Sequence, residues 1–134
     1  MDGITLSYTA QHGANTVYSI ALKTFGDSSV MRARQQTTST SSSANGTTVL
    51  AGSSYAQKSL WNVVAIDTKA NVLTIDEMYA AWDKDRADGL AAAVGVNDTT
   101  FGAAVVTSAV FPNSPQFTKL GENLYEASFV LTEV

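Results

Sequence analysis

The chain begins with a regular alternation of large apolar and small polar residues. In residues 4–9 every second residue is apolar, so Ile4, Leu6 and Tyr8 fall on one face of a predicted β-strand. Residues 17–23 repeat this period of two. The link between the two runs is short and contains a glycine, which is typical of a turn. The pattern predicts an opening β-hairpin.

A long run of small polar residues follows. Residues 35–48 read QQTTSTSSSANGTT, and such a segment cannot bury enough apolar surface to fold by itself. The whole stretch 27–48 is too long for an ordinary hairpin loop. Two interpretations stay open: a surface loop or loosely packed β-arm, or an arm that becomes ordered only against a neighbouring subunit.

The middle of the chain predicts two strands and a helix. Residues 48–50 form a short predicted strand, and residues 58–67 (KSLWNVVAID) have apolar side chains on both faces, as in a central strand. Thr74 and Glu77 have the spacing of a capping box and predict the start of the helix, which Gly89 is expected to end or to weaken. The helix carries one apolar stripe at i, i+3, i+4 and i+7: Ile75, Met78, Tyr79 and Trp82.

Strand patterns return in the last third of the chain, with strands predicted at 99–110, 116–120 and 123–134. The predicted fold class is therefore mainly β (α+β): an antiparallel β-sandwich or barrel-like sheet with one packed α-helix and a long β-arm. A length of 134 residues fits a single domain, residues 1–134.

Composition narrows the possible functions. The chain carries 8 Lys and Arg against 12 Asp and Glu, a formal net charge of −4. This acidic balance argues against specific nucleic-acid recognition, which needs clustered cations. Cysteine is absent, which excludes disulfides and thiolate nucleophiles and fits folding in a reducing cytoplasm. The N-terminus lacks a signal-peptide pattern and no run approaches about 18 apolar residues, so no membrane span is predicted.

The residues that could carry chemistry do not form a recognisable site. His12 is the only histidine, and in a predicted turn it is expected to be an exposed residue without a catalytic role. Asp83, Asp85 and Asp88 fail the spacing of a calcium loop, and the interleaved lysine and arginine favour a solvated helix face. The sequence therefore predicts no catalytic residue, no metal site, no cofactor and no enzymatic activity.

The second half of the chain combines a Trp-containing strand (SLWNVVAID), a helix that opens with TIDEM and continues with AAW, and a closing amphipathic strand (NLYEASFVLTEV). In this combination it resembles the small tail proteins of tailed bacteriophages. The similarity covers about residues 54–134 and points to minor and distal tail proteins, which are related in fold to tail-tube proteins. The resemblance implies a virion protein, made in the bacterial cytoplasm, that forms a ring (a hexamer or trimer) and stacks on other tail proteins.

In such a ring the polar arm contacts an adjacent subunit or ring. The implied inter-subunit residues stand at the base of the arm: Arg32, Arg34, Gln35 and Gln36. The alternative function is a β-sandwich binding module for glycan or protein adhesion that uses exposed aromatic residues. Under the leading interpretation the aromatic residues belong to the core, with Trp61 and Trp82 meeting beneath the helix.

Overall fold

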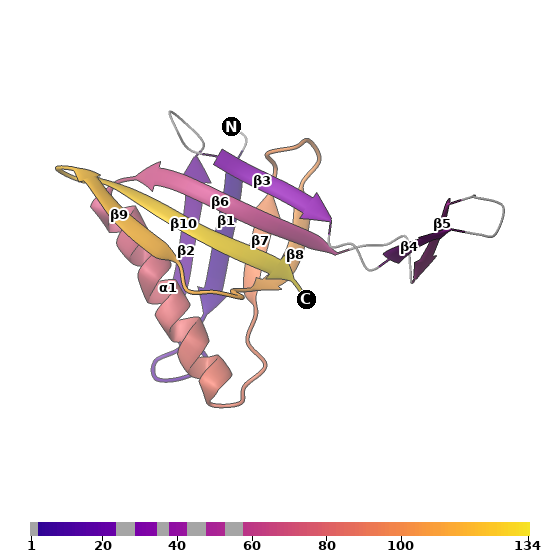
Figure 1. The fold of residues 1–134 in the computed structure, drawn as a ribbon. Helices are drawn as coiled ribbons and strands as arrows, with labels where there is room; N and C mark the ends of the chain where they lie inside the picture. The colour runs from indigo at the N-terminus through magenta and orange to yellow at the C-terminus, as the bar shows by residue number, and fades with distance from the viewer. Residues whose placement is uncertain (1–2, 24–28, 35–37, 43–47, 53–57) are drawn as a thin grey trace.

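The computed structural model describes residues 3–23, 29–34, 38–42, 48–52 and 58–134. In these ranges the chain forms ten β-strands and one α-helix (Figure 1). The strands are β1 (Gly3–Thr9), β2 (Val17–Lys23), β3 (Ser29–Arg34), β4 (Thr38–Ser42), β5 (Thr48–Gly52), β6 (Ser59–Asp67), β7 (Val94–Asp98), β8 (Val105–Val110), β9 (Gln116–Gly121) and β10 (Leu124–Glu133). The helix α1 (Lys69–Ala87) lies between β6 and β7 in the sequence.

Eight strands form one antiparallel sheet in the order β2-β1-β7-β8-β10-β6-β3, with β9 also paired to β10. The described register between β8 and β10 has only two pairs, Thr132 with Val110 and Glu133 with Ala109. One half of the sheet (β2, β1, β7, β8) therefore runs across the other half (β9, β10, β6, β3) (Figure 1). The mainly β prediction is confirmed. The barrel-like alternative is wrong, because the end strands β2 and β3 do not pair with each other.

The core lies between the two halves of the sheet. The predicted alternation in β1 is confirmed, since Ile4 and Leu6 are fully buried and Tyr8 is 5% exposed. From the other half, Trp61 in β6 and Leu131 in β10 are also fully buried. Helix α1 contacts β1, β2 and β10 and covers the open side of the bent sheet (Figure 1).

Helix α1 begins earlier than the sequence predicts. Its N-cap is Thr68, so the capping box predicted at Thr74 and Glu77 is wrong. Thr74 lies inside the helix, where its hydroxyl donates a hydrogen bond to the carbonyl oxygen of Ala70 at 3.0 Å. This bond back to the preceding turn satisfies the hydroxyl within the helix.

The end of α1 and its apolar stripe match the prediction. Gly89 has a φ of +83°, and the Leu90 N–H donates to the Asp85 carbonyl at 3.0 Å, which is a Schellman-type helix end. The predicted stripe residues are buried or half-buried: Ile75, Met78, Tyr79 and Trp82.

The strand predicted over residues 99–110 is confirmed for residues 105–110 and wrong for residues 99–104. The structure has β7 before this range, a loop over residues 99–104, and β8 after the loop. Asp98 and Val105 face each other in the β7–β8 pair, and Gly102, with a φ of +115°, adopts a conformation in the loop that favours glycine. The apolar residues of this loop continued the strand pattern and hid the turn.

The predicted polar stretch 27–48 begins with a strand of the main sheet. Strand β3 pairs with β6 as far as Arg34 and Ser59. Beyond that pair, β4 and β5 form a separate two-stranded sheet, which stands apart from the rest in Figure 1. The β4–β5 pair thus lies between β3 and β6 in the sequence and outside the main sheet. The segment 35–58 that contains this pair is hereafter called the arm. The strand predicted at 48–50 is confirmed as part of β5.

Candidate functional site

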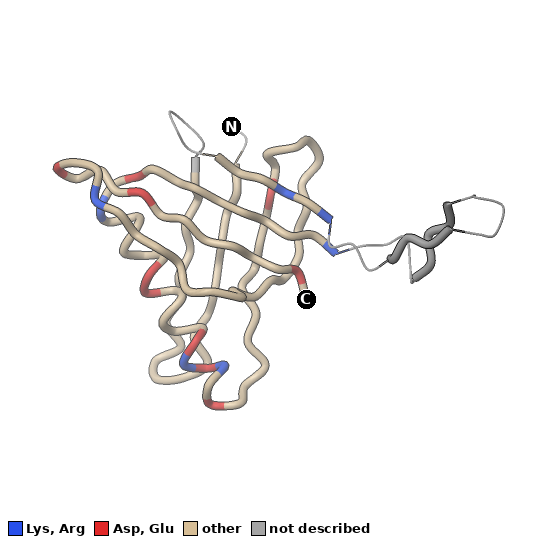
Figure 2. Tube along the Cα trace, viewed as in Figure 1, with Lys and Arg blue, Asp and Glu red and all other residues tan. Residues whose placement is uncertain are grey.

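Three cations stand where the arm leaves the sheet: Arg32, Arg34 and Lys58 (Figure 2). Arg34 and Lys58 are exposed, and neither forms an ion pair with a described residue. The carboxylate of Glu133 lies at the same end and accepts a hydrogen bond from the Ser59 backbone N–H at 3.0 Å. The other predicted contact residues lie outside the described part of the chain: Gln35 and Gln36.

Arg32 differs from Arg34 and Lys58 because it has ionic and aromatic partners among the described residues. Its Nη1 lies 3.9 Å from Oδ2 of Asp98, and its guanidinium carbon lies 5.5 Å from the ring centre of Phe101. The distance to Phe101 is within the range of a cation–π contact. Arg32 therefore links β3 to the β7–β8 loop.

Asp98 is a buried carboxylate with a full set of donors. It is 1% exposed, and it accepts hydrogen bonds from the Trp61 indole N–H and the Thr100 backbone N–H, each at 2.9 Å. Burial favours the neutral acid, but the bonds from Trp61 and Thr100 and the charge of Arg32 outweigh it and lower the pKa of Asp98. The ionised group joins β6, β3 and the β7–β8 loop.

A second buried carboxylate belongs to Asp85, and the predicted solvated position is wrong for this residue. Its side chain is fully buried. It accepts hydrogen bonds from the Tyr8 hydroxyl and from the Gln11 backbone N–H, the latter at 2.8 Å. Nδ1 of His12 lies 2.5 Å from Oδ1 of Asp85. The prediction of an exposed His12 is also wrong, because the side chain is 33% exposed and held by this contact.

The Asp85 contacts shift two pKa values. Burial raises the pKa of Asp85, but the bonds from Tyr8, Gln11 and His12 prevail and hold it at about 2. Burial, followed by the bond to Asp85, raises the pKa of Tyr8 to about 12. Near neutral pH the pair is therefore a carboxylate and a neutral phenol.

The other two aspartates of this helix end lie at the surface, as predicted. Asp83 pairs with Arg86 at 2.6 Å, and Asp88 pairs with Lys84 at 2.9 Å. These i,i+3 and i,i+4 pairs are ordinary exposed helix contacts. The helix stripe explains the difference, since Asp85 continues the spacing of Ile75, Met78 and Trp82 into the core.

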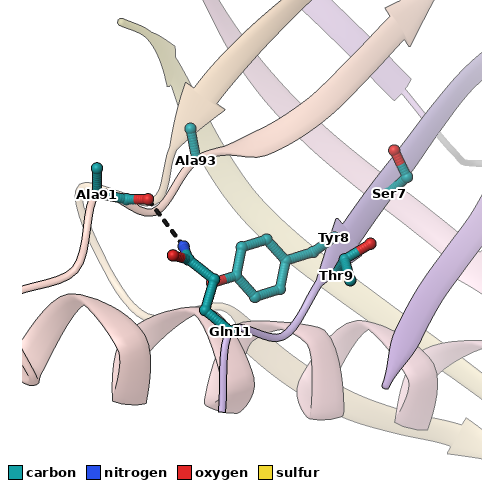
Figure 3. A pocket seen from close by; sticks show the side chains of 6 residues that line it. All are labelled: Ser7, Tyr8, Thr9, Gln11, Ala91 and Ala93. Atoms are coloured by element: carbon teal, nitrogen blue, oxygen red, sulfur yellow. Dashed lines mark hydrogen bonds between the residues drawn. The ribbon is translucent and has the colours of Figure 1, made fainter. Parts of the chain in front are cut away.

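A shallow hollow lies beside the Asp85 cluster (Figure 3). The Gln11 side chain crosses it and donates from Nε2 to the Ala91 carbonyl at 2.8 Å. An imidazole held by a carboxylate can serve as a general base, but no hydroxyl among the described residues hydrogen-bonds to His12. The contacts fasten the β1–β2 turn to α1 and to the α1–β7 connection. The hollow is lined by Ser7, Tyr8, Thr9, Gln11, Ala91 and Ala93.

The large aromatic residues are mostly core residues, as predicted. Trp82 packs against Tyr79 and Phe111 at ring-centre distances of 5.9 and 5.5 Å, and its indole N–H donates to the Ala92 carbonyl at 3.1 Å. Trp61 is buried in the same core but hydrogen-bonds to the carboxylate described above. The two tryptophans therefore have different polar partners.

Charged residues avoid much of the sheet surface. They gather on α1, at the base of the arm and around the β9–β10 turn (Figure 2). Strands β1 and β8 contain none, and β2 contains only Lys23 at its end. Within the described ranges, β2 pairs only with β1, and β3 pairs only with β6. Strand β9 likewise pairs only with β10, so three strands of the sheet have a single described neighbour, and much of the sheet surface is uncharged.

Comparison with models of known protein families and with curated proteins finds no match. In the part of the chain that the structure describes, no helix has the length and apolar character to cross a membrane. Among the same residues, no three histidine or carboxylate side chains come together as possible metal ligands.

Proposed function

We propose that this protein is a structural component of a bacteriophage tail that assembles with copies of itself into a ring. The arm is the observation that carries the proposal. It extends the β3–β6 hairpin and forms a two-stranded sheet of its own, although its sequence is almost entirely small and polar. A two-stranded sheet is marginal in water by itself, so a neighbouring subunit is the natural source of the missing contacts.

The sheet edges support the same proposal. Strands β2 and β3 lie at the two ends of the sheet, and an edge strand presents unpaired N–H and C=O groups. Residues 17–22 of β2 contain neither proline nor charge, the usual protections against strand pairing. Contacts between different surfaces of identical subunits close into a ring when the rotation allows it; the proposed ring is a trimer or hexamer.

The tail assignment rests on the resemblance of residues 54–134 to phage tail proteins. On this basis we propose that the protein is a tail-tube, distal tail or minor tail component, with other tail proteins as further partners. The protein would be made in the bacterial cytoplasm and end in the virion tail.

Replacing the arm tests the proposal. Arg34 and Ser59 face each other in the β3–β6 pair, so an Asn-Gly turn can replace residues 35–58 and close a short hairpin. We expect rings of the wild type in negative-stain images and in sedimentation, and folded monomers of the shortened variant. A Gly/Ser arm of equal length is the matched control for reach, and it should also fail to form rings.

Two results would overturn the proposal. One is a wild type that remains a monomer at every concentration, particularly if it binds glycans on an array, since this would favour the adhesion module. The other is ring formation by the shortened variant equal to that of the wild type.

A further inference from the structure

An exposed aromatic residue stands at the tip of the β7–β8 loop. The Phe101 side chain is 55% exposed, and the three residues after it are exposed and uncharged: Gly102, Ala103 and Ala104. Arg32 lies over the ring, with its guanidinium carbon 5.5 Å from the ring centre. Leaving a phenyl ring in water is unfavourable by comparison with burial, and a partner surface would remove that cost.

An apolar groove of matching size lies elsewhere on the molecule, between α1 and strands β9 and β10. Its volume is about 140 Å³, close to the roughly 150 Å³ of a protein cavity that holds benzene. Leu73 and Phe117, 46% and 37% exposed, leave it accessible. The groove is lined by Lys69, Val72, Leu73, Asp76, Phe117 and Tyr125.

We propose that the Phe101 ring of one copy docks in this groove of a second copy of the chain. The inference rests on the self-assembly of the proposed function and names one contact that would produce it. Arg32 accompanies the ring, and Asp76 stands at the rim of the groove without an ion pair to any described residue. Docking therefore brings a cation to a carboxylate as the ring leaves water.

The end of the molecule from which the arm extends and the end that holds the groove differ in charge (Figure 2). This difference supports a contact between the arm end of one copy and the groove end of another. Among the described residues, the side chains at the arm end include three cations and two carboxylates: Arg32, Arg34, Lys58, Asp98 and Glu133. The groove end has two cations and five carboxylates: Lys69, Lys119, Asp67, Asp76, Glu77, Glu122 and Glu126. Ends of opposite net charge attract each other in a head-to-tail arrangement.

The ring and the groove cannot meet within one copy. Trp61 bonds to Asp98 near the Phe101 loop, whereas Asp67 pairs with Tyr125, which lines the groove. These two positions of β6 are six residues apart, or roughly 20 Å at 3.3 Å per residue. Each contact leaves one free ring and one free groove, so contacts continue until a ring closes or a filament grows.

Two complementary variants test the contact. Phe101→Ser removes the ring from an exposed loop, and Leu73→Arg blocks the groove with a long cation that also repels Arg32. We expect the dissociation constant of assembly, measured by sedimentation velocity, to rise at least about tenfold for each variant alone. A factor of this size corresponds to the loss of one buried phenyl ring. Val106→Ser and Leu90→Arg are the matched controls, because these apolar residues are 74% and 41% exposed and belong neither to the Phe101 loop nor to the groove, and they should assemble as the wild type does.

The decisive measurement is a mixture of the two variants. Phe101→Ser keeps its groove and Leu73→Arg keeps its ring, so one contact can form between the two variants, and the mixture should contain a one-to-one pair at concentrations where neither variant associates alone. Assembly of Phe101→Ser equal to wild type, or the absence of the mixed pair, would refute this contact while the ring proposal stood. A wild type that never assembles would refute both.

Discussion

The Tyr8 hydroxyl offers a sharp test of the buried Asp85 cluster. Tyr8→Phe removes the phenol that donates to the carboxylate and keeps the ring that packs in the core. Two donors remain on Asp85, the Gln11 backbone N–H and the His12 imidazole. The variant therefore isolates one hydrogen bond to a charged group.

The expected loss of stability in Tyr8→Phe follows from the kind of hydrogen bond that is removed. A hydrogen bond to a charged group contributes roughly 1.5–3 kcal/mol to the free energy of unfolding. For a domain of this size about 4 °C of Tm corresponds to 1 kcal/mol, so we expect Tm to fall by roughly 6–12 °C. Urea unfolding at neutral pH measures the free energy directly, and an unchanged m-value would show that the unfolded state is unaffected.

Tyr18→Phe is the matched control. Tyr18 faces Tyr8 across the β1–β2 pair and packs at the edge of the same core, but its hydroxyl has no hydrogen bond to a described residue. We expect a change within about 0.5 kcal/mol for this control. Equal stabilities of the two variants would refute the role assigned to the Tyr8 hydroxyl.

The acid dependence gives an independent check on the same bond. The pKa of Asp85 is about 2 in the folded protein against an ordinary 3.8, so the ionised group stabilises the fold above pH 3.8 and this contribution disappears as pH falls toward 2. Without the Tyr8 donor the folded pKa moves back toward its ordinary value. The stability difference between wild type and Tyr8→Phe should therefore narrow in acid.

The stability of the protein in alkaline solution gives a second check on the Tyr8 hydroxyl. The pKa of Tyr8 is raised from 10.0 to about 12, so the neutral phenol stabilises the fold fully below pH 10, and this contribution is lost as pH rises through 12. An ultraviolet titration of the tyrosines should show one late step, absent from Tyr8→Phe.

Two further substitutions test the other structural assignments. Trp61→Phe removes a donor from ionised Asp98 and should lower the free energy of unfolding in urea by roughly 1.5–3 kcal/mol beyond the effect of the smaller side chain. Trp82→Phe removes a donor from a neutral carbonyl and should lower it by less. The reverse order would contradict the charged state assigned to Asp98. Gly89→Ala forces alanine to a φ of +83° at a cost of about 1–2 kcal/mol. Gly121→Ala, with no positive φ and its nearest other side-chain atom 4.0 Å away, should stay within about 0.5 kcal/mol.

The alternating pattern of residues 4–9 and the helix stripe from Ile75 to Trp82 determined much of the fold. A strand or helix places side chains by its own period, so local sequence is enough to show which faces are buried. The polar composition of residues 35–48 likewise marked the arm. Gly89 identified the end of the helix because few other residues adopt its conformation.

Tertiary structure alone decided where the polar groups of the core lie. Asp85 and His12 are 73 positions apart, and Trp61 and Asp98 are 37 apart, so no local pattern joins them. The only sign of the Asp85 cluster in the local sequence was a charged residue at a position of the apolar helix stripe. A buried carboxylate requires hydrogen-bond donors, and folding brings these donors from distant parts of the chain. The same holds for the Phe101 loop and its proposed groove, which the bend of the sheet and the position of α1 place at opposite ends.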